Sequence, residues 1–185
     1  DCVDQNVGKL VAELKKLGAY ENTLIVFLCD NGGSAEPVRL GLNKGKGEIG
    51  TAESFAYYGA SWANVSDTPF RKFKASLHEG GIASPFVAHW PAGIREDLQG
   101  EIVHEPAHVI DLMATCVDLS GAPYPEEFKD QPIHPMAGIS LKPAFEGRSL
   151  DRGQPLFSEF NGCKAIRDGR WKLVADKGRS WELYN

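Results

Sequence analysis

The chain has 185 residues, of which 42% are hydrophobic and 24% are charged, and its formal net charge is −5. This much apolar sequence is enough for the core of one globular domain, with or without a small appendage. The acidic balance argues against a nucleic-acid partner, because no stretch forms a basic stripe. No apolar run approaches the ~20 residues that a membrane-spanning helix needs.

The first two elements of the sequence predict an α/β fold. Apolar residues recur at helical spacing over residues 3–14, which predicts an amphipathic helix that ends near Gly18. A continuous apolar run follows at residues 23–29, without polar alternation, and this is typical of a strand buried on both faces in a parallel sheet. A helix followed by a buried strand is the order of α/β proteins.

Asp30 and Asn31 follow this strand, with Gly32 and Gly33 directly after them. In open α/β sheets, ligands bind beyond the carboxyl ends of the strands. A carboxylate beside an amide carbonyl offers the hard oxygen ligands that Ca²⁺ and Mg²⁺ prefer. The same four residues are also typical of an Asx turn that closes a strand without any ligand. Taken alone, this stretch favours the turn.

The long stretch from residue 34 to residue 73 has no clear periodicity, and its length predicts a functional loop that covers a site. Lys44-Gly45-Lys46-Gly47 lacks the spacing of a phosphate-binding loop, so we interpret it as surface. A second short buried strand is expected at residues 86–90.

The second half of the sequence begins with a helix and ends in short strands. The helix is expected over residues 106–120, closed by Gly121. Pro- and Gly-rich residues 122–150 predict loops. Three strands with an alternating pattern follow, over residues 155–160, 164–167 and 171–175. A tight turn at Asp168-Gly169 joins the last two as a hairpin. We therefore place a domain boundary at residue 150, with a small antiparallel subdomain over residues 151–185.

The four cysteines lie far apart and make no Cys-x-x-Cys pair, which argues against a zinc site or a redox motif. Cys29 and Cys116 fall within apolar patterns, and we expect both to be small buried hydrophobic residues.

Several of these segments together resemble the sulfatases, specifically the arylsulfatase type within the alkaline-phosphatase-like superfamily. The segments are Asn-Thr-Leu-Ile-Val-Phe-Leu-Cys-Asp-Asn-Gly-Gly at residues 22–33, Lys-Ala-Ser-Leu-His-Glu-Gly-Gly-Ile at residues 74–82, Val-Ile-Asp-Leu-Met-Ala-Thr at residues 109–115 and Ala-Ile-Arg-Asp-Gly-Arg-Trp-Lys-Leu-Val at residues 165–174. Each motif is weak by itself, but the ordered set covers nearly the whole chain. The resemblance implies an α/β fold, here its C-terminal part, with a small antiparallel α+β subdomain.

The resemblance also implies a function, the hydrolysis of sulfate monoesters. Asp30 and Asn31 would be two ligands of a Ca²⁺ ion, or of Mg²⁺, and Lys74 would bind the sulfate group. A divalent cation and an ammonium group stabilise the negative charge that develops on oxygen as the S–O bond breaks. His78 precedes Glu79 and is a candidate proton donor to the leaving oxygen. A histidine that simply packs in the turn is at least as compatible with its position.

Family enzymes use a formylglycine nucleophile made from Cys-x-Pro/Ala-x-Arg at a helix start, well before the Asp-Asn-Gly strand. Few residues precede Asp30, so we expect this chain to be a C-terminal fragment that needs the rest of the sulfatase domain and is inactive alone. Cys163-Lys-Ala-Ile-Arg167 fits the pattern literally, but it lies in the predicted hairpin, where no helix start can face an anion. We interpret Cys163 as a strand residue.

Two other functions remain open. The first is a phosphatase or phosphodiesterase of the same superfamily, and the second is a non-catalytic relative that binds sulfated glycans. The expected partner is a sulfated small molecule or glycan, with no nucleic acid and no membrane span. By resemblance alone, the location would be extracytoplasmic: periplasmic, secreted or lysosomal.

Overall fold

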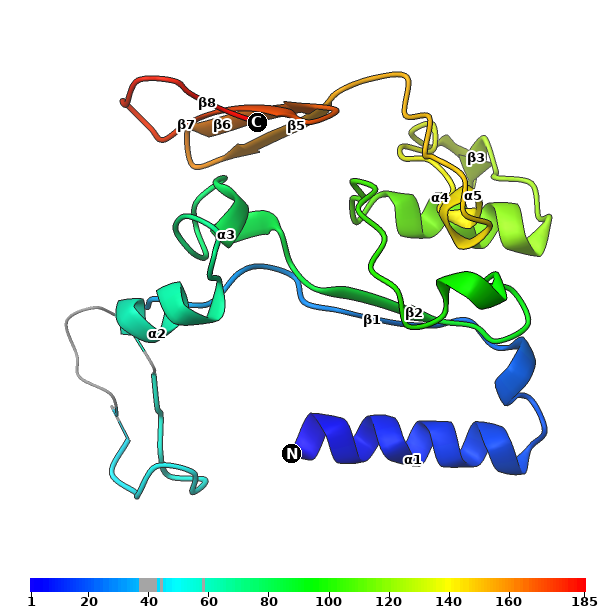
Figure 1. Cartoon of the computed structure of the whole chain (residues 1–185), viewed down its shortest axis with the longest axis horizontal. Helices are drawn as coiled ribbons and strands as arrows, with labels where there is room; N and C mark the ends of the chain where they lie inside the picture. Colours follow the sequence, from blue (N-terminus) through cyan, green and yellow to red (C-terminus); the bar gives the residue numbers. More distant parts are fainter. Residues whose placement is uncertain (37–42, 44, 58) are drawn as a thin grey trace. The chain divides into compact units, whose positions relative to one another are not determined.

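The computed structural model describes residues 1–36, 43, 45–57 and 59–185 (Figure 1). Two compact units make up the chain. Unit 1 contains residues 1–26 and 88–153, and unit 2 contains residues 27–87 and 154–185. The predicted boundary at residue 150 remains a prediction. None of the helices formed by the described residues is long and apolar enough to cross a membrane.

Most of the regular secondary structure of unit 1 is helical. Its helices are α1 (Cys2–Lys16), α4 (Asp111–Ser120) and α5 (Lys142–Phe145), with 3-10 turns at Tyr20–Asn22 and Glu96–Leu98 and a short hairpin of β3 (Glu127–Phe128) and β4 (Gln131–Pro132). The helix predicted at residues 3–14 is therefore confirmed. Residues 122–150 were expected to be loops only, and β3, β4 and α5 correct that expectation.

Helix α4 begins at Asp111, five residues later than predicted, and ends at Gly121 as predicted. Gly121 has a φ of 66°, the left-handed conformation in which glycine ends helices without a Cβ clash. The late start has a local cause. The Asp111 carboxylate accepts a hydrogen bond from the His108 backbone N–H at 2.7 Å, which holds residues 108–110 in a turn ahead of the helix.

Asp111 is also the centre of a buried ion pair. Its side chain is fully buried, and it accepts hydrogen bonds from Arg152 Nη1 at 2.9 Å and Nη2 at 2.6 Å. The backbone N–H of Ile139 donates to the same carboxylate at 3.0 Å. Burial by itself raises the pKa of Asp111, but the Arg152 guanidinium and the backbone donors outweigh it, so the pKa lies below its ordinary value. Both oxygens of this carboxylate are therefore fully used within the fold.

Strands β1 (Ile25–Leu28) and β2 (Phe86–His89) pair as a two-stranded sheet, and both lie where apolar strands were predicted. Beyond the strands, Cys29 N donates to Pro85 O and Gly32 N donates to Gly81 O. As one segment advances along the chain its partner retreats, so the two segments run antiparallel. The first strand was expected to lie in a parallel sheet, and the pair that it forms with β2 does not fit that expectation.

Full burial of these two strands was also expected, and it is wrong for the described residues. Phe27 is 43% exposed and Val87 is 56% exposed. The side chains of a strand project from its two faces, so they stay exposed wherever no other element packs on a face. Cys29 and Cys116 are exposed as well, against expectation. On α4 the buried positions are Asp111, Ala114 and Thr115, and Cys116 lies outside that stripe.

In unit 2, the predicted loop from residue 34 to residue 73 contains a helix, α2 (Gly59–Ser66). This corrects the expectation of an irregular segment. Only Ala63 of this helix is buried, so the sequence shows too little periodicity to reveal it. Lys44 of the Lys-Gly-Lys-Gly stretch lies outside the described residues.

The C-terminal part of unit 2 is an antiparallel sheet in the order β5 (Leu156–Phe160), β6 (Cys163–Asp168), β7 (Trp171–Ala175) and β8 (Glu182–Tyr184). The predicted strands and hairpin are confirmed. Because Asp168 pairs with Trp171, Gly169 and Arg170 form the turn.

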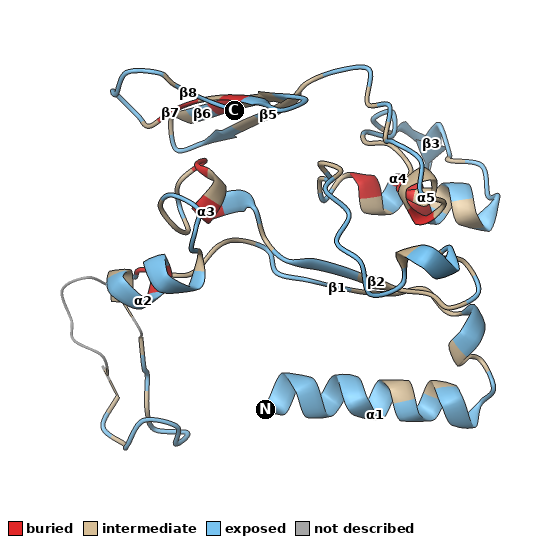
Figure 2. Ribbon diagram, viewed as in Figure 1, coloured by how far each residue is buried: buried red, intermediate tan, exposed pale blue. Residues whose placement is uncertain are grey.

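The short helix α3 (Glu79–Ile82) belongs to the same unit as this sheet. Leu77, just before α3, forms an apolar core with Ala165 of β6 and Val174 of β7. Figure 2 shows buried residues on α3 and in this sheet. The core therefore holds the segment that carries Lys74 and His78 against the face of the sheet.

Candidate functional site

The turn at residues 30–33 is held in place through its backbone, entirely within unit 2. Gly32 N donates to Gly81 O at 3.0 Å, and Gly33 O accepts from Lys74 N at 3.0 Å. The Gly33 N–H points at the Asp67 carboxylate, with its two oxygens at 2.9 and 3.1 Å. These bonds bring the Asp-Asn-Gly-Gly motif and the Lys-x4-Glu-Gly-Gly motif, which are 40 residues apart in sequence, into one site.

Two glycines permit this close approach. A Cβ on Gly32 would lie 1.8 Å from the carbonyl oxygen of Gly80, and a Cβ on Gly80 would lie 2.0 Å from the carbonyl oxygen of Lys72. No side chain fits at such distances from backbone atoms, so glycine is required at both positions for steric reasons. The glycines of both motifs therefore serve to pack the two segments together.

The side chains of Asp30 and Asn31 are nearly free of internal contacts. Asp30 is exposed and makes no hydrogen bond or ion pair with any residue that the structure describes. Asn31 Nδ2 donates to Gly32 O at 2.9 Å, which leaves its Oδ1 available as an acceptor. A free carboxylate next to a free amide oxygen fits the donor set of Ca²⁺ or Mg²⁺. Among the described residues, no group of three or more His, Cys, Asp or Glu could hold a metal, so the pair supplies only part of a coordination sphere.

Lys74 lies beside this turn, with its backbone bonded to Gly33 and its side chain partly exposed. Its Nζ is 3.8 Å from a carboxylate oxygen of Glu36, whose side chain is 70% exposed. An ion pair this open to water contributes little energy, so the ammonium remains available to an anion. Two neighbours, Lys72 and Ala75, adopt left-handed conformations with φ of 66° and 74°. Such conformations are uncommon outside glycine and often mark functional turns.

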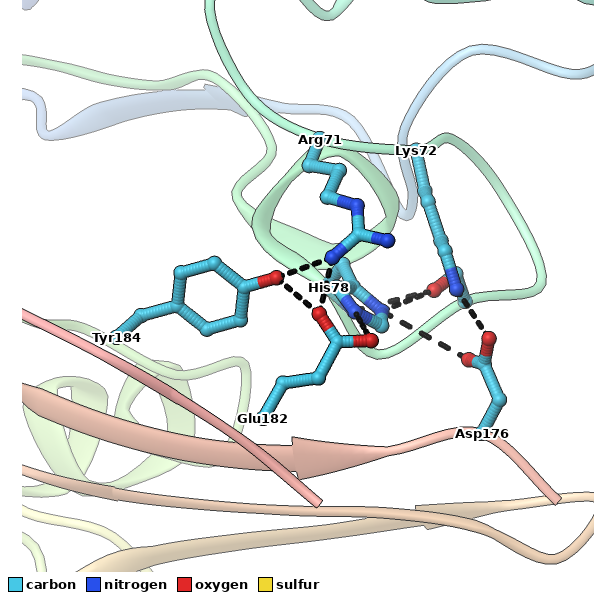
Figure 3. A network of polar contacts seen from close by, with 7 residues as sticks. Arg71, Lys72, His78, Asp176, Glu182 and Tyr184 are labelled. Atoms are coloured by element: carbon cyan, nitrogen blue, oxygen red, sulfur yellow. Dashed lines mark hydrogen bonds and ion pairs between the residues drawn. The ribbon is translucent and has the colours of Figure 1, made fainter. Parts of the chain in front are cut away.

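His78 is buried, with only 2% of its surface exposed. Its Nδ1 is 2.9 Å from Ser76 Oγ and 3.7 Å from Asp176, and its Nε2 is 3.6 Å from Glu182 (Figure 3). At these distances the two carboxylates are ion-pair partners only when the imidazole is protonated. Nε2 has no hydrogen-bond partner among the described residues.

Cations from the same segment compete for these carboxylates. Arg71 pairs with Glu182 and with the Tyr184 hydroxyl, and Lys72 pairs with Asp176 (Figure 3). Burial lowers the pKa of His78 below its ordinary value, and the charge of Lys72 lowers it further, against the opposing effect of Asp176 and Glu182. The neutral imidazole is therefore the favoured form at neutral pH.

Glu79 ties α3 to the sheet in the same way. Its carboxylate pairs with Lys172 and, at 3.3 Å, with Arg167 Nη1. Burial lowers the pKa of the Lys172 ammonium, although Glu79 opposes this. Both carboxylate oxygens of Glu79 are therefore engaged in ion pairs with the sheet. These ion pairs anchor the segment that carries Lys74 and His78.

Cys163 lies at the start of β6 and packs against the core of Leu77, Ala165 and Val174. It is therefore a strand residue in its contacts, as the sequence predicted. Residues that the sequence did not single out are Asp67, Asp176 and Glu182. Each acts on a partner at least 34 positions away, and no local pattern signals such a contact.

A profile of the family described as Sulfatase matches residues 1–122. An uncharacterized sulfatase of Schizosaccharomyces pombe is 29% identical over 208 residues, covering all of this chain and 36% of that protein. Human arylsulfatase A is 30% identical over 176 residues, covering 92% of this chain and 28% of that protein. The chain thus spans about a third of the length of the relatives it matches.

The solved structure of Ps i-CgsB in complex with k-i-k-neocarrahexaose has a TM-score of 0.68 and 28% identity to this chain. It covers 98% of this chain, and this chain covers 34% of it. The expected α/β fold of the sulfatase type is confirmed by this similarity. With a family profile that matches about two thirds of its length, the chain belongs to the sulfatase family.

Proposed function

We propose that this chain forms part of a sulfuric ester hydrolase of the arylsulfatase type. The observation that carries the proposal is the hydrogen bond between Lys74 N and Gly33 O, which joins the candidate metal turn to the candidate sulfate-binding lysine. One site then offers a free carboxylate, a free amide oxygen and an available ammonium. Membership of the sulfatase family supports the same reaction.

Each residue has a role in the proposal. Asp30 and Asn31 donate two oxygen ligands to a Ca²⁺ ion, or to Mg²⁺, whose charge would stabilise oxygen anions of the substrate. Lys74 binds the sulfate group through its ammonium, where a charged donor stabilises the developing charge. The formylglycine nucleophile and the remaining metal ligands come from residues other than these. The isolated chain is expected to be inactive.

For His78, the burial of the ring and its contacts with Ser76, Asp176 and Glu182 favour packing in the turn over direct proton donation. We propose that it supports the segment that carries Lys74. Sulfated glycans are the proposed substrate class, since a solved relative binds an oligosaccharide. An extracytoplasmic location is proposed from the family resemblance alone.

The test uses the full-length protein and compares turnover of 4-nitrophenyl sulfate with that of 4-nitrophenyl phosphate. Sulfate turnover that falls about 100-fold in Lys74→Ala, as for loss of an oxyanion donor, supports the proposal. Lys164→Ala is the matched control, because Lys164 is an exposed lysine of β6 whose side chain has no partner among the described residues.

Other outcomes separate the alternatives. Preferred turnover of the phosphate ester would instead indicate a phosphatase or phosphodiesterase of the superfamily. Binding of sulfated glycans without turnover of either ester would indicate a non-catalytic relative. Unchanged Ca²⁺ affinity in Asp30→Ala, measured by calorimetric titration, would remove the metal assignment.

A further inference from the structure

The turn that carries Asp30 and Asn31 has few anchors. Asp30 has no partner among the described residues, and the one side-chain bond of Asn31 goes to the neighbouring Gly32 carbonyl. The positions of these two side chains therefore depend on the flanking backbone, which is held before the pair by the bond from Cys29 N to Pro85 O and after the pair at residues 32 and 33. Three contacts fix the backbone of residues 32 and 33: Gly32 N to Gly81 O, Gly33 O to Lys74 N, and Gly33 N to the Asp67 carboxylate.

Asp67 differs from the other two anchors. It follows α2 directly, and it reaches 34 residues back along the chain to accept the Gly33 N–H. The other anchors are main-chain groups, so they depend on chain path and not on residue type. Among the described contacts, Asp67 is the one residue outside the turn whose side chain bonds to the backbone of the turn. A hydrogen bond to an ionised acceptor is roughly twice as strong as one between neutral groups.

We propose that Asp67 is a positioning residue for the metal-binding turn. Its carboxylate fixes the Gly33 N–H and so places the oxygens of Asp30 and Asn31 for the cation. The backbone N–H of Lys74 also donates to Gly33. By fixing Gly33, Asp67 therefore also sets the spacing between the cation and the sulfate-binding lysine. This inference rests on the proposed function, because it assigns a role within the same site.

Removal of the Asp67 carboxylate should weaken binding of the cation. Without Asp67 the turn keeps its ligands, but they are no longer pre-organised, and the cation must order them on binding. Loss of an outer-shell partner of this kind typically lowers metal affinity or activity by about 10- to 100-fold. Because the ligands themselves remain, excess cation should restore activity.

The experiment uses the full-length protein with Asp67→Ala and Asp67→Asn, and Asp168→Asn as the control. Asp168 is an exposed aspartate at the β6–β7 turn, and its side chain has no partner among the described residues. Calorimetric titration of metal-free protein should show Ca²⁺ affinity falling about 10- to 100-fold in Asp67→Ala. Asp67→Asn should fall between, since an amide oxygen still accepts one hydrogen bond. Saturating Ca²⁺ should restore most of the kcat for 4-nitrophenyl sulfate in both variants.

Parent-like Ca²⁺ affinity in Asp67→Ala, with affinity lost in Asp30→Ala, would overturn the positioning role and leave the proposed function intact. If the parent itself neither binds Ca²⁺ nor cleaves the sulfate ester, the proposed function fails. Amide hydrogen exchange then tests, independently of Ca²⁺ binding, whether Asp67 holds the turn. Faster exchange over residues 30–33 in Asp67→Ala shows that Asp67 holds the turn, and unchanged exchange overturns that too.

Discussion

Asp30 and Asp111 are two aspartates at the edge of apolar segments, and the structure uses them in opposite ways. Asp111, in unit 1, is fully buried, and Arg152 and two backbone N–H groups occupy both of its oxygens. Asp30, in unit 2, is exposed and has no partner among the described residues. A satisfied carboxylate stabilises the fold, whereas a carboxylate left free on an anchored turn is available to a ligand.

The same contrast separates the two halves of the candidate site. The candidate metal-binding turn at residues 30–33 is fixed through its backbone, which leaves the Asp30 carboxylate and the Asn31 Oδ1 without a partner among the described residues. The segment that contains His78 and Glu79 is fixed largely through its side chains: His78 Nδ1 lies 2.9 Å from Ser76 Oγ, and Glu79 pairs with Lys172 and Arg167 of the sheet. The candidate binding residues and the supporting residues thus differ in how many of their polar atoms the described contacts satisfy.

The largest effect is expected at the satisfied aspartate. Asp111→Ala leaves the mostly buried Arg152 guanidinium without a counter-charge, and the loss of stability should be about 3–5 kcal/mol. Urea denaturation of the full-length protein measures this. Asp97→Ala is the matched control, since Asp97 forms a similar two-oxygen pair with Arg95 on the surface. Equal losses of stability from the two substitutions would show that the buried Asp111–Arg152 pair contributes no more than the exposed Asp97–Arg95 pair.

A smaller effect is expected where the two motifs touch. Gly80→Ala places a Cβ against the Lys72 carbonyl, and relief of that overlap requires backbone shifts costing about 1–3 kcal/mol. The matched change Gly8→Ala, in helix α1 with nothing within 4 Å of the new Cβ, should instead raise stability by about 0.5–1 kcal/mol. Thermal unfolding compares the two variants. A destabilised Gly8→Ala variant would refute the view that the cost of a Cβ depends on the space around the glycine.

The buried histidine gives a pH-dependent effect. The pKa of His78 is lowered from 6.5 by burial first and then by Lys72, while Asp176 and Glu182 oppose the shift and Arg71 adds to it. The unfolded chain therefore binds more protons than the folded chain between the lowered pKa and about 6.5. Stability contributed by neutral His78 is complete above that range and falls as the pH drops through it.

The slope should be no steeper than about 1.4 kcal/mol per pH unit, the value for one proton. Urea denaturation at pH 7.5, 6.5 and 5.5 should show the parent losing more stability than His78→Gln. The difference between the two proteins removes the contribution of other titrating groups. A difference that stays constant from pH 7.5 to pH 5.5 would show that His78 does not titrate across the transition.

The smallest effect on stability is expected at the free aspartate. Asp30→Ala removes no hydrogen bond or ion pair to the described residues, so the free energy of unfolding of the metal-free protein should change by less than about 0.5 kcal/mol. Ca²⁺ should then stabilise the parent more than the variant, because a ligand that binds the folded state adds to its stability. Thermal unfolding with and without Ca²⁺ measures both. A large loss of stability without the metal would make Asp30 structural, like Asp111.

Much of the local structure was predictable from sequence. Helix α1 and the hairpin of β6 and β7 follow from apolar periods of 3.6 and 2, and Gly121 ends α4 because it alone there tolerates a left-handed conformation. The residues Asp30 and Asn31 offer hard oxygen ligands after an apolar run, but this stretch alone favours a turn, and it was the resemblance to the sulfatases that made them candidate metal ligands. These features depend on neighbours within a few residues, which is the range over which periodicity and turn chemistry act.

Tertiary structure decided which polar groups the fold uses and which it leaves free. Asp67 meets Gly33 across 34 residues, and Glu79 meets Lys172 across 93, and no local pattern encodes either contact. The burial of β1 and Cys116 was overestimated for the same reason, since exposure depends on which elements pack against a surface. Residue types, together with the resemblance of the ordered motifs to the sulfatases, therefore proposed the chemistry of the site. Only the packing of distant segments showed that Asp30 is free and that Asp111 is not.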